Sequence, residues 1–465
     1  MERYKDLLSQ LEDYANDNYL PMHMPGGKRK VGSLDAPNPY AYDITEIDGF
    51  DNMHNPNGVI KDMMCHASRI FGADYSFPLI NGSTAGILTA ISAVCHEGER
   101  VLVARNCHIS VYNGIMLNNL KADYFMPKMN EYGIYMGVKL SDIQSFFDKA
   151  SDYSAVIITS PTYEGYVSDV KEIAEFLHAR KIPLIVDEAH GAHFCLSESF
   201  PQSAVENKAD IVIQSIHKTL PALTQTAVLH VCGKLVDKDR IIRYWNIYQT
   251  TSPSYILLGS IDRCLSILDV CNVEKYVDNL VKLREKLRKV PNIKLLETDD
   301  ISKIVLITDD GKNFAKRLLD EYKIQLEMAS YNYVIAMTSF MDTEEDYERF
   351  LTAVTKVSAA KSSVAESLST ELSVIESSVI ESSVAKLPAI ESSAANFNDE
   401  DNYNESGEYA ELLKYLEANL NKKSEKIVAI YPPGIPAIAV GELITKEVIG
   451  QIRRAVEADL EIVYY

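Results

Sequence analysis

Long hydrophobic runs are absent from this sequence. No stretch approaches the roughly 18 apolar residues that a membrane span requires, and the first residues, MERYKDLLSQLEDY, are charged where a signal peptide would have an apolar core. We therefore expect no membrane contact and no signal peptide. Cysteine is sparse too: the chain has seven, an odd number, with no C-x-x-C pair. Such a set is typical of reduced thiols and indicates a cytoplasmic location.

Basic residues are scarce relative to acidic ones. The chain has 46 Lys and Arg against 66 Asp and Glu, which gives a formal net charge of −20. This balance disfavours nucleic acid as a partner, because phosphate backbones are bound by clustered Lys and Arg. It is compatible with a cationic small substrate, and equally with an acidic surface that only keeps the protein in solution. The 465 residues, 46% of them hydrophobic, indicate a globular protein of roughly two or three domains.

Short apolar runs alternate with amphipathic stretches in the first half of the chain. The segment 169–181 (DVKEIAEFLHARK) has apolar residues three and four positions apart, which predicts a helix. Alternating strands and helices predict a mostly parallel sheet with helices on both faces, and ligands in such sheets bind at the carboxyl ends of the strands. The predicted buried strands are Arg100–Ala104, Ala155–Thr159, Ile182–Val186, Asp210–Gln214 and Ala227–Val231.

Changes in amino-acid composition and pattern divide the chain into four parts. Residues 1–290 are predicted to form an N-terminal arm and the major domain, and residues 291–357 to begin a smaller α/β domain. Residues 358–408 are rich in Ser and Glu and repeat the motif IESSV, which predicts a flexible insertion; a docking segment is the alternative. Residues 409–465 are predicted to complete the small C-terminal domain.

Local patterns supply the expected elements of the later part of the chain. They are strands at Lys303–Thr308, Tyr333–Thr338 and Lys426–Ile430, helices at Thr343–Val357 and Tyr409–Asn421, and a loop at Tyr431–Pro436.

Three segments of the major domain together describe one ligand. Lys218 follows an apolar strand in the segment QSIHKTL, and Asp187 ends another strand in the segment IVDEAH. The segment INGSTAG, residues 80–86, joins an apolar run to a helix, whose N-terminus can bind a phosphate. A phosphate site, an acid that keeps a ring nitrogen protonated, and a lysine that forms an imine are what pyridoxal phosphate requires.

The sequence resembles the bacterial ornithine/lysine/arginine decarboxylases, and among them the short arginine or lysine decarboxylases. The resemblance runs from about Tyr19 to Val357 and resumes at Lys426. It implies an α/β fold, with a fold type I, aspartate-aminotransferase-like major domain that binds pyridoxal phosphate and a smaller α/β C-terminal domain. The motifs that carry it are His23-Met-Pro-Gly-Gly-Lys28, Asp43-Ile-Thr-Glu46, Gly72-Ala-Asp74, Asn81-Gly-Ser-Thr84, Asn106-Cys-His108, Ser160-Pro-Thr-Tyr-Glu-Gly165, Asp187-Glu-Ala-His-Gly-Ala-His193, Ser215-Ile-His-Lys218, Thr251-Ser-Pro-Ser254 and Tyr431-Pro-Pro-Gly-Ile-Pro436.

The resemblance also implies a role for individual residues. Lys218 would form the Schiff base, Asp187 would pair with the pyridine nitrogen, and His108 would stack on the cofactor ring. His190 would lie near the ring and the substrate. Active sites of this family form between subunits, so we expect a homodimer or a larger homo-oligomer. The residues that would hold the phosphate are Gly82, Ser83, Thr84, Ser215 and His217, with Ser252 reaching in from a second subunit.

A basic amino acid as substrate requires an acid that faces its distal cation. Glu46 and Asp48, in an acidic segment with Asp43 and Asp51, are candidates, and so is Glu442. The proton that replaces the lost carboxylate at Cα would come from His217, from Lys218 or from a cysteine.

The chain departs from the family pattern in several places, none of which touches the cofactor set. Gly27 stands where a His is usual, Asn57 where a Glu is common, and Val440 where a Pro is frequent. The Ser-rich insertion also lies outside the usual pattern.

The function that these observations predict is decarboxylation of arginine to agmatine or of lysine to cadaverine, with ornithine third, as in polyamine biosynthesis. An aminotransferase, another lyase of the same fold, or a non-catalytic homologue that regulates a decarboxylase are the alternatives. The letters DEAH at 187–190 do not indicate a helicase, because no G-x-x-x-x-G-K-[ST] loop accompanies them. His190 and His193 lack a clear third metal ligand, so we predict no metal site.

Overall fold

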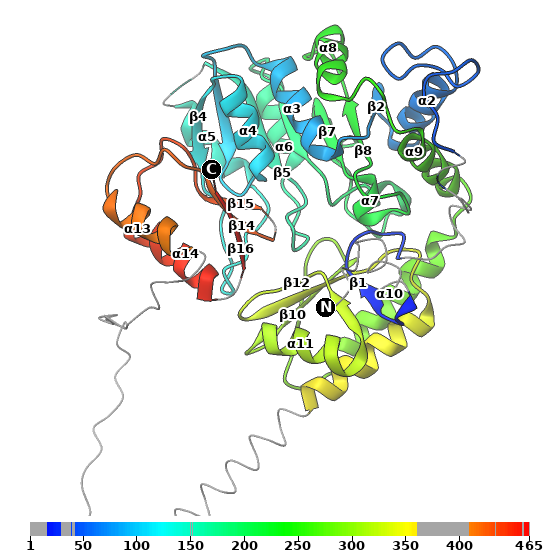
Figure 1. Cartoon of the computed structure of the whole chain (residues 1–465), viewed down its shortest axis with the longest axis vertical. Coiled ribbons are helices and arrows are strands. Elements are labelled where there is room, and N and C mark those ends of the chain that lie inside the picture. The colour runs from blue at the N-terminus through cyan, green and yellow to red at the C-terminus, as the bar shows by residue number, and fades with distance from the viewer. Residues whose placement is uncertain are drawn as a thin grey trace, which may run out of the picture.

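A computed structural model describes residues 16–28, 39, 42–148, 150, 152–359, 409–432, 434–457 and 460–464. The predicted insertion at 358–408 lies outside these residues except at its first two positions, and so do all of its IESSV repeats. The described chain forms a large upper domain, a smaller domain below it and a C-terminal module at the side of the large domain (Figure 1). Within these ranges, no helix combines the length and apolar character needed to cross a membrane.

The large domain is built on a seven-stranded sheet with the order β2-β8-β7-β6-β5-β3-β4. Strand β8 runs antiparallel to both of its neighbours and the other pairs are parallel, so the sheet is mostly parallel, as predicted. The strands are β2 (Tyr75–Leu79), β3 (Arg100–Ala104), β4 (Lys121–Phe125), β5 (Tyr153–Thr159), β6 (Leu184–Asp187), β7 (Ile211–Gln214) and β8 (Ala227–Val231).

Eight α-helices of the described chain belong to this part of the sequence. The segment predicted as a helix at 169–181 forms α6, whose apolar residues are buried while its charged residues face outward. The helices are α2 (Val59–Phe71), α3 (Gly82–Val94), α4 (Ile109–Leu117), α5 (Leu140–Phe147), α6 (Val170–His178), α7 (Ile216–Thr219), α8 (Lys238–Tyr248) and α9 (Tyr255–Leu268).

The small domain is a four-stranded antiparallel sheet with the order β12-β13-β10-β9. Its apolar core also takes in helix α10, whereas residues up to 290 were expected to belong to the major domain. The physical reason is the apolar face of α10, which packs against Leu295 and Ile304 of the small sheet. The elements are α10 (Val273–Leu287), β9 (Lys294–Leu296), β10 (Lys303–Ile307), α11 (Gly311–Tyr322), β11 (Ile324–Leu326), β12 (Met328–Ala329), β13 (Tyr333–Met337) and a helix over 344–359.

The N-terminal arm crosses from the small domain to the large one. Strand β1 (Leu20–Met22) pairs in parallel with β11, and the buried Lys28 donates hydrogen bonds to the carbonyls of Pro21 and Met337. The backbone N–H of Gly26 donates to the carbonyl of His217. A Cβ at Gly26 would lie 2.5 Å from the carbonyl carbon of Thr219, so only glycine allows the arm to come this close to α7. The HMPGGK motif therefore holds the segment that carries Lys218.

The last part of the chain forms a module of its own. Its three described strands pair only with one another, in the order β15-β14-β16, and its helices cover them around a separate apolar core. Residues 409–465 were expected to complete the small C-terminal domain, and in the structure their strands make their backbone hydrogen bonds within the module. The loop expected at 431–436 is shorter in the structure, because Tyr431 ends one strand and Ile435 begins the next; residue 433 lies outside the described ranges. The elements are α13 (Ala410–Ala418), β14 (Val428–Tyr431), β15 (Ile435–Ile438), α14 (Lys446–Glu457) and β16 (Glu461–Tyr464).

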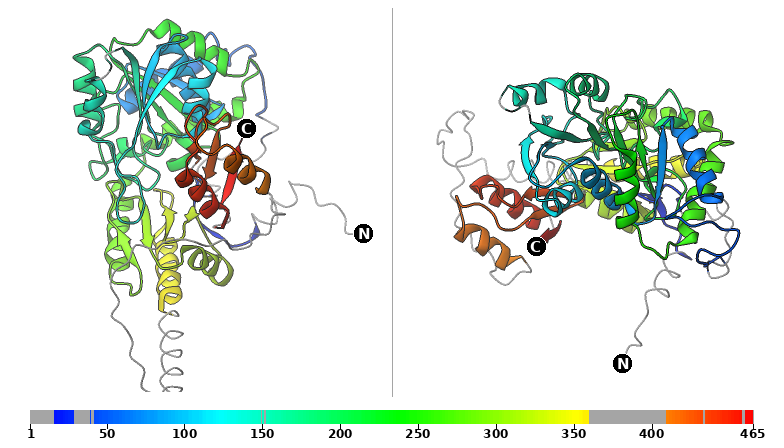
Figure 2. Two further views of the ribbon diagram at one scale, coloured as in Figure 1. Left: turned by 90° about the vertical axis from the view of Figure 1, so that its left-hand side faces the viewer. Right: turned by 90° about the horizontal axis from the view of Figure 1, so that it is seen from above.

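Ionic contacts attach this module to the large domain, beside which it lies in both views of Figure 2. Arg105, directly after β3, donates from Nε and Nη2 to the two carboxylate oxygens of Glu442 at 3.0 and 2.9 Å. Its Nη1 donates to the carbonyl of Pro436 and to the hydroxyl of Tyr112. A guanidinium held at all three nitrogens is a rigid link between the two parts.

Candidate active site

A cavity of about 1200 Å³ lies where the large domain, the small domain and the C-terminal module meet. It is at the carboxyl ends of β5, β6 and β7, the edge of the sheet where the fold predicts ligands. The sequence-predicted residues that line it are Gly82, Ser83, Thr84, His108, Asp187, His190, Ser215, His217, Lys218 and Glu442.

The N-terminus of α3 forms one end of the cavity. Gly82 has a φ of +72°, and its N–H donates to the carbonyl of Gln225, which fixes the turn that begins the helix. The Ser83 hydroxyl lies 2.6 Å from that of Ser215, so residues far apart in sequence meet here. Hydroxyls beside the free N–H groups of a helix N-terminus make an anion site that suits a phosphate.

Asp187 lies at the end of β6, where its side chain is buried. Its Oδ1 accepts a hydrogen bond from the N–H of Ala189 at 3.1 Å. Burial raises the pKa of this carboxyl, although the charge of Lys218 opposes the effect. Among the described residues the carboxylate forms no ion pair. A buried acid of this kind fits a cationic N–H of a ligand in the cavity.

Lys218 follows β7 on the short helix α7. Its Nζ lies 3.0 Å from Nε2 of His190. Burial lowers the pKa of this amine, and the charge of Asp187 works in the opposite direction. A lowered pKa favours the uncharged amine, which is the form that attacks a carbonyl.

His108 is the residue that would stack on a ring. It caps α4, and its Nδ1 accepts a hydrogen bond from the N–H of Ser110 at 3.2 Å, so the proton of the neutral ring is on Nε2. Burial, together with the charge of Lys218, lowers the pKa of His108 to about 4. The turn of the C-terminal module approaches this ring: Tyr431 meets it edge-on, and the carbonyl of Gly434 accepts the N–H of Ile109.

The imidazole of His217 is held by the backbone on one side. Its Nδ1 donates to the carbonyl of Thr226 at 2.8 Å, because a carbonyl can only accept. Burial lowers the pKa of the ring, and Nε2 remains as the atom that can exchange a proton.

The two histidines of the DEAHGAH motif have different neighbours. His190 lies between Lys218 and Lys303, whereas His193 pairs through Nε2 with Asp300 at 3.1 Å. Within the described ranges, no group of three or more His, Cys, Asp or Glu side chains is arranged to hold a metal ion.

A sequence model of the Orn/Lys/Arg decarboxylase major domain matches residues 7–314, about two thirds of the chain. The chain belongs to this decarboxylase family. An arginine decarboxylase of Bacillus anthracis is 28% identical over 98% of this chain and 94% of its own length. The lysine decarboxylase LdcF of Francisella novicida has a similar structure, with a TM-score of 0.70 at 19% identity over 99% of this chain and 82% of its own.

Solved structures of enzymes other than decarboxylases also have a fold similar to that of this chain. The serine palmitoyltransferase of Sphingomonas wittichii is similar over 74% of this chain and 88% of its own, with a TM-score of 0.58 at 17% identity. The predicted fold type I architecture, with an aspartate-aminotransferase-like major domain, is confirmed by these neighbours.

Several residues that the resemblance to the decarboxylases singled out lie outside the cavity of the single chain. Glu46, Asp48 and Ser252 are exposed and do not line it. Their expected roles involve a second subunit and stay predictions. Asp51 has a local function, because its carboxylate accepts hydrogen bonds from the N–H groups of residues 57, 58, 60 and 61 at the start of α2.

Glu442 lines the cavity, but the structure gives its carboxylate another partner. Both of its oxygens accept hydrogen bonds from Arg105, and Oε2 also accepts the N–H of Ala439. We expect Glu442→Gln to lower the free energy of unfolding by about 2 kcal/mol, because the buried Arg105 loses its charged acceptor. The shift can be measured by urea denaturation followed by circular dichroism.

Glu447, exposed at the same cavity, supplies the control for this prediction. Glu447→Gln should leave the unfolding curve unchanged. A Glu442→Gln protein with unaltered stability and a raised KM would instead assign Glu442 to the substrate cation.

Two further buried side chains of the site have no clear signal in the sequence. Glu164, in the SPTYEG motif, accepts a hydrogen bond from the hydroxyl of Tyr333, and burial raises its pKa. Lys303 is the first residue of β10, a position at which a lysine normally indicates an exposed strand end. Only the arrangement of the two domains shows that its Nζ lies 2.9 Å from Nδ1 of His190.

Proposed function

We propose that this chain is a pyridoxal-phosphate-dependent decarboxylase of a basic amino acid, with arginine and lysine ahead of ornithine. The observation that carries the proposal is the position of three chemical groups around one cavity: the amine of the half-buried Lys218, the buried carboxylate of Asp187 and the hydroxyl pair of Ser83 and Ser215. Membership of the decarboxylase family, the arginine decarboxylase relative and the lysine decarboxylase neighbour support it.

The residues of the cavity fit pyridoxal phosphate. Ser83, Ser215 and the N-terminus of α3 would bind the phosphate, Asp187 would face the ring nitrogen, and His108 would cover the ring. Pyridoxal phosphate, bound through Lys218, supplies an electron sink for the pair that remains when the Cα–carboxylate bond breaks. The buried carboxylate of Asp187 makes that sink stronger, because it stabilises a positive charge on the ring nitrogen away from water.

The remaining steps belong to side chains of the protein. Lys218, as an uncharged amine, can exchange with the amino group of a substrate. Since Nδ1 of His217 carries the proton donated to Thr226, its Nε2 would first accept a proton and could then return that proton to Cα. Cysteine is the weaker donor, because the nearby Cys107 is buried and burial raises the pKa of its thiol to about 12.

Recognition of the distal cation is proposed to involve acids from two subunits. Glu442 is paired with Arg105 in the single chain. Glu46 and Asp48 are exposed, and in a homodimer with shared active sites they would be able to face the cavity of the other subunit. Such an arrangement would also explain why Ser252 lies outside the cavity of its own chain.

The test is to incubate the purified chain and pyridoxal phosphate with arginine, lysine or ornithine in turn, and to measure CO₂ and the mass of the product. We expect stoichiometric CO₂ and agmatine or cadaverine, with putrescine third. A keto acid without CO₂ would indicate an aminotransferase. Absence of any reaction, with the cofactor still bound at Lys218, would indicate a non-catalytic homologue and contradict the proposal.

A further inference from the structure

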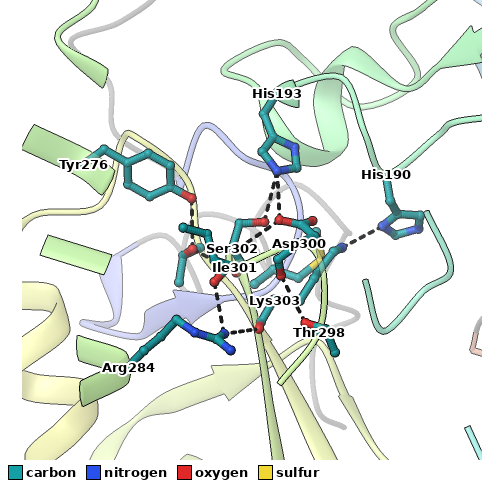
Figure 3. A network of polar contacts seen from close by, with 11 residues as sticks. His190, His193, Tyr276, Arg284, Thr298, Asp300, Ile301, Ser302 and Lys303 are labelled. Atoms are coloured by element: carbon teal, nitrogen blue, oxygen red, sulfur yellow. Dashed lines mark hydrogen bonds and ion pairs between the residues drawn. The ribbon is translucent and has the colours of Figure 1, made fainter. Parts of the chain in front are cut away.

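Lys303 is buried in an unusual way for a lysine. It begins β10 of the small domain, its side chain has no exposed surface, and its Nζ lies 2.9 Å from Nδ1 of His190 and 3.6 Å from Sδ of Met337 (Figure 3). In the part of the chain that the structure describes, no carboxylate accepts a hydrogen bond from this amine. A buried ammonium without an ion pair is costly, and its polar contact is instead to a residue of the candidate active site.

The surrounding backbone is shaped to hold this side chain. Gly165, with a φ of +104°, has room for only a hydrogen on its Cα, because a Cβ would come within 2.9 Å of Cγ of Lys303. The carbonyl of Lys303 accepts a hydrogen bond from Nη1 of Arg284 at 3.0 Å. Asp300, three residues earlier, is fixed by His193 and by the N–H of Ser302. The stem of Lys303 therefore has a fixed course toward His190.

His190 joins two lysines. Its Nδ1 faces Lys303 and its Nε2 faces Lys218 at 3.0 Å. Burial and the charges of both lysines keep the pKa of this imidazole well below its usual value, so the ring is neutral. A neutral imidazole donates from one nitrogen and accepts at the other. The lysine that receives the N–H must be an uncharged amine, so no more than one of the two lysines carries a proton charge.

More carboxylates attract a proton at Lys303 than at Lys218. A proton at Lys303 is attracted by the carboxylates of Asp300, Glu327 and Glu164. A proton at Lys218 is attracted by those of Asp187 and Glu327. Burial lowers the pKa of Lys303 to about 8, which still leaves the amine mostly charged at neutral pH. Other titratable groups also face the relay. They are His108, His217 and Tyr163 from the large domain, the last with its ring edge-on to His190 at 5.2 Å, and Lys28 of the N-terminal arm on the far side of Met337.

We propose that Lys303 is a positioning residue of the active site: it donates to Nδ1 of His190, directs the Nε2 proton of that ring at Lys218, and so keeps the Lys218 amine uncharged and nucleophilic. The inference rests on the proposed function, because the use of this amine is to bind pyridoxal phosphate. It also gives the small domain a chemical part in the site, since His190 and Lys218 belong to the large domain.

The test compares Lys303→Met, which keeps the length of the side chain but removes the donor and the charge, with Lys303→Gln, which keeps an N–H donor. The full-length chain, stripped of cofactor, is mixed with pyridoxal phosphate at pH 6 to 10. The adduct at Lys218 is trapped with borohydride and quantified by peptide mass. We expect Lys303→Met to react about tenfold more slowly at neutral pH, and to approach the wild-type rate at high pH, because its Lys218 must first lose a proton. Lys303→Gln should recover most of the rate.

Lys234, an exposed lysine outside the relay, supplies the matched control, and Lys234→Met should match the wild type at every pH. A Lys303→Met profile equal to the wild type, or one lowered by the same factor at all pH values, would overturn the inference and leave the proposed function intact. If the wild type itself forms no adduct at Lys218, both the cofactor assignment and the inference fall. If Lys303→Met does not fold, Lys303→Gln decides: a wild-type profile supports the donor role, and a profile shifted to higher pH contradicts it.

Discussion

Lys218→Ala is expected to abolish CO₂ release, with kcat/KM lowered about a thousandfold or more, in the range seen when a catalytic nucleophile is removed. The half-buried Lys218 follows the carboxyl end of β7, its amine lies 3.0 Å from His190, and desolvation lowers the pKa of that amine. No other lysine of the described chain lines the cavity. The measurement is CO₂ release with arginine, lysine and ornithine, together with mass spectrometry of the borohydride-treated protein.

The control for this prediction is Lys234→Ala, because Lys234 is exposed and does not line the cavity. That variant should retain full activity. A Lys218→Ala protein that still released CO₂ at the wild-type rate would contradict the catalytic assignment, because decarboxylation would then proceed without Lys218.

Asp187→Asn should lower kcat about a hundredfold or more while changing KM much less. The variant preserves the shape of the side chain and its hydrogen bond from the N–H of Ala189, but it removes the negative charge. At a buried position the charge is what stabilises a protonated ring nitrogen, and its loss weakens electron withdrawal from the breaking bond rather than substrate binding. Steady-state rates at saturating substrate test the prediction.

A spectroscopic titration of bound cofactor separates this effect from a folding defect. In Asp187→Asn the ring nitrogen should lose its proton at a lower pH than in the wild type. Asp62→Asn, a change on the exposed face of α2, should alter neither the rate nor the titration. Equal kcat in Asp187→Asn and the wild type would contradict the role given to this acid.

The sequence predicted best what depends on local pattern. The strands Arg100–Ala104 and Ala227–Val231 occur at the predicted residues, because a short run buried on both faces is mostly apolar. Lys218, Asp187 and the helix that begins at Gly82 meet in one cavity because each follows a strand, and the carboxyl ends of parallel strands share one edge of the sheet.

What the sequence could not show is which distant residues meet. Nothing local in the strands of the C-terminal module tells which sheet they join. Lys303 looks like an ordinary polar strand end, and its contact with His190 depends on how two domains pack. Glu442 was expected to face a substrate. Its actual partner, Arg105, lies 337 positions away in the sequence, so no local pattern could indicate this pairing. The roles expected of Glu46, Asp48 and Ser252 involve a second subunit and stay predictions.

The bridge between Arg105 and Glu442 has a consequence for the order in which the protein is made. Ribosomes add about 5 to 20 residues per second, so Arg105 leaves the ribosome roughly 20 to 70 seconds before the carboxylate that is 337 positions later. During that interval the large domain can fold, but its cavity has no C-terminal wall, and the turn that contacts His108 does not yet exist. The nascent chain therefore completes this cavity only after the C-terminal module has been made, because that module adds the final side of the cavity.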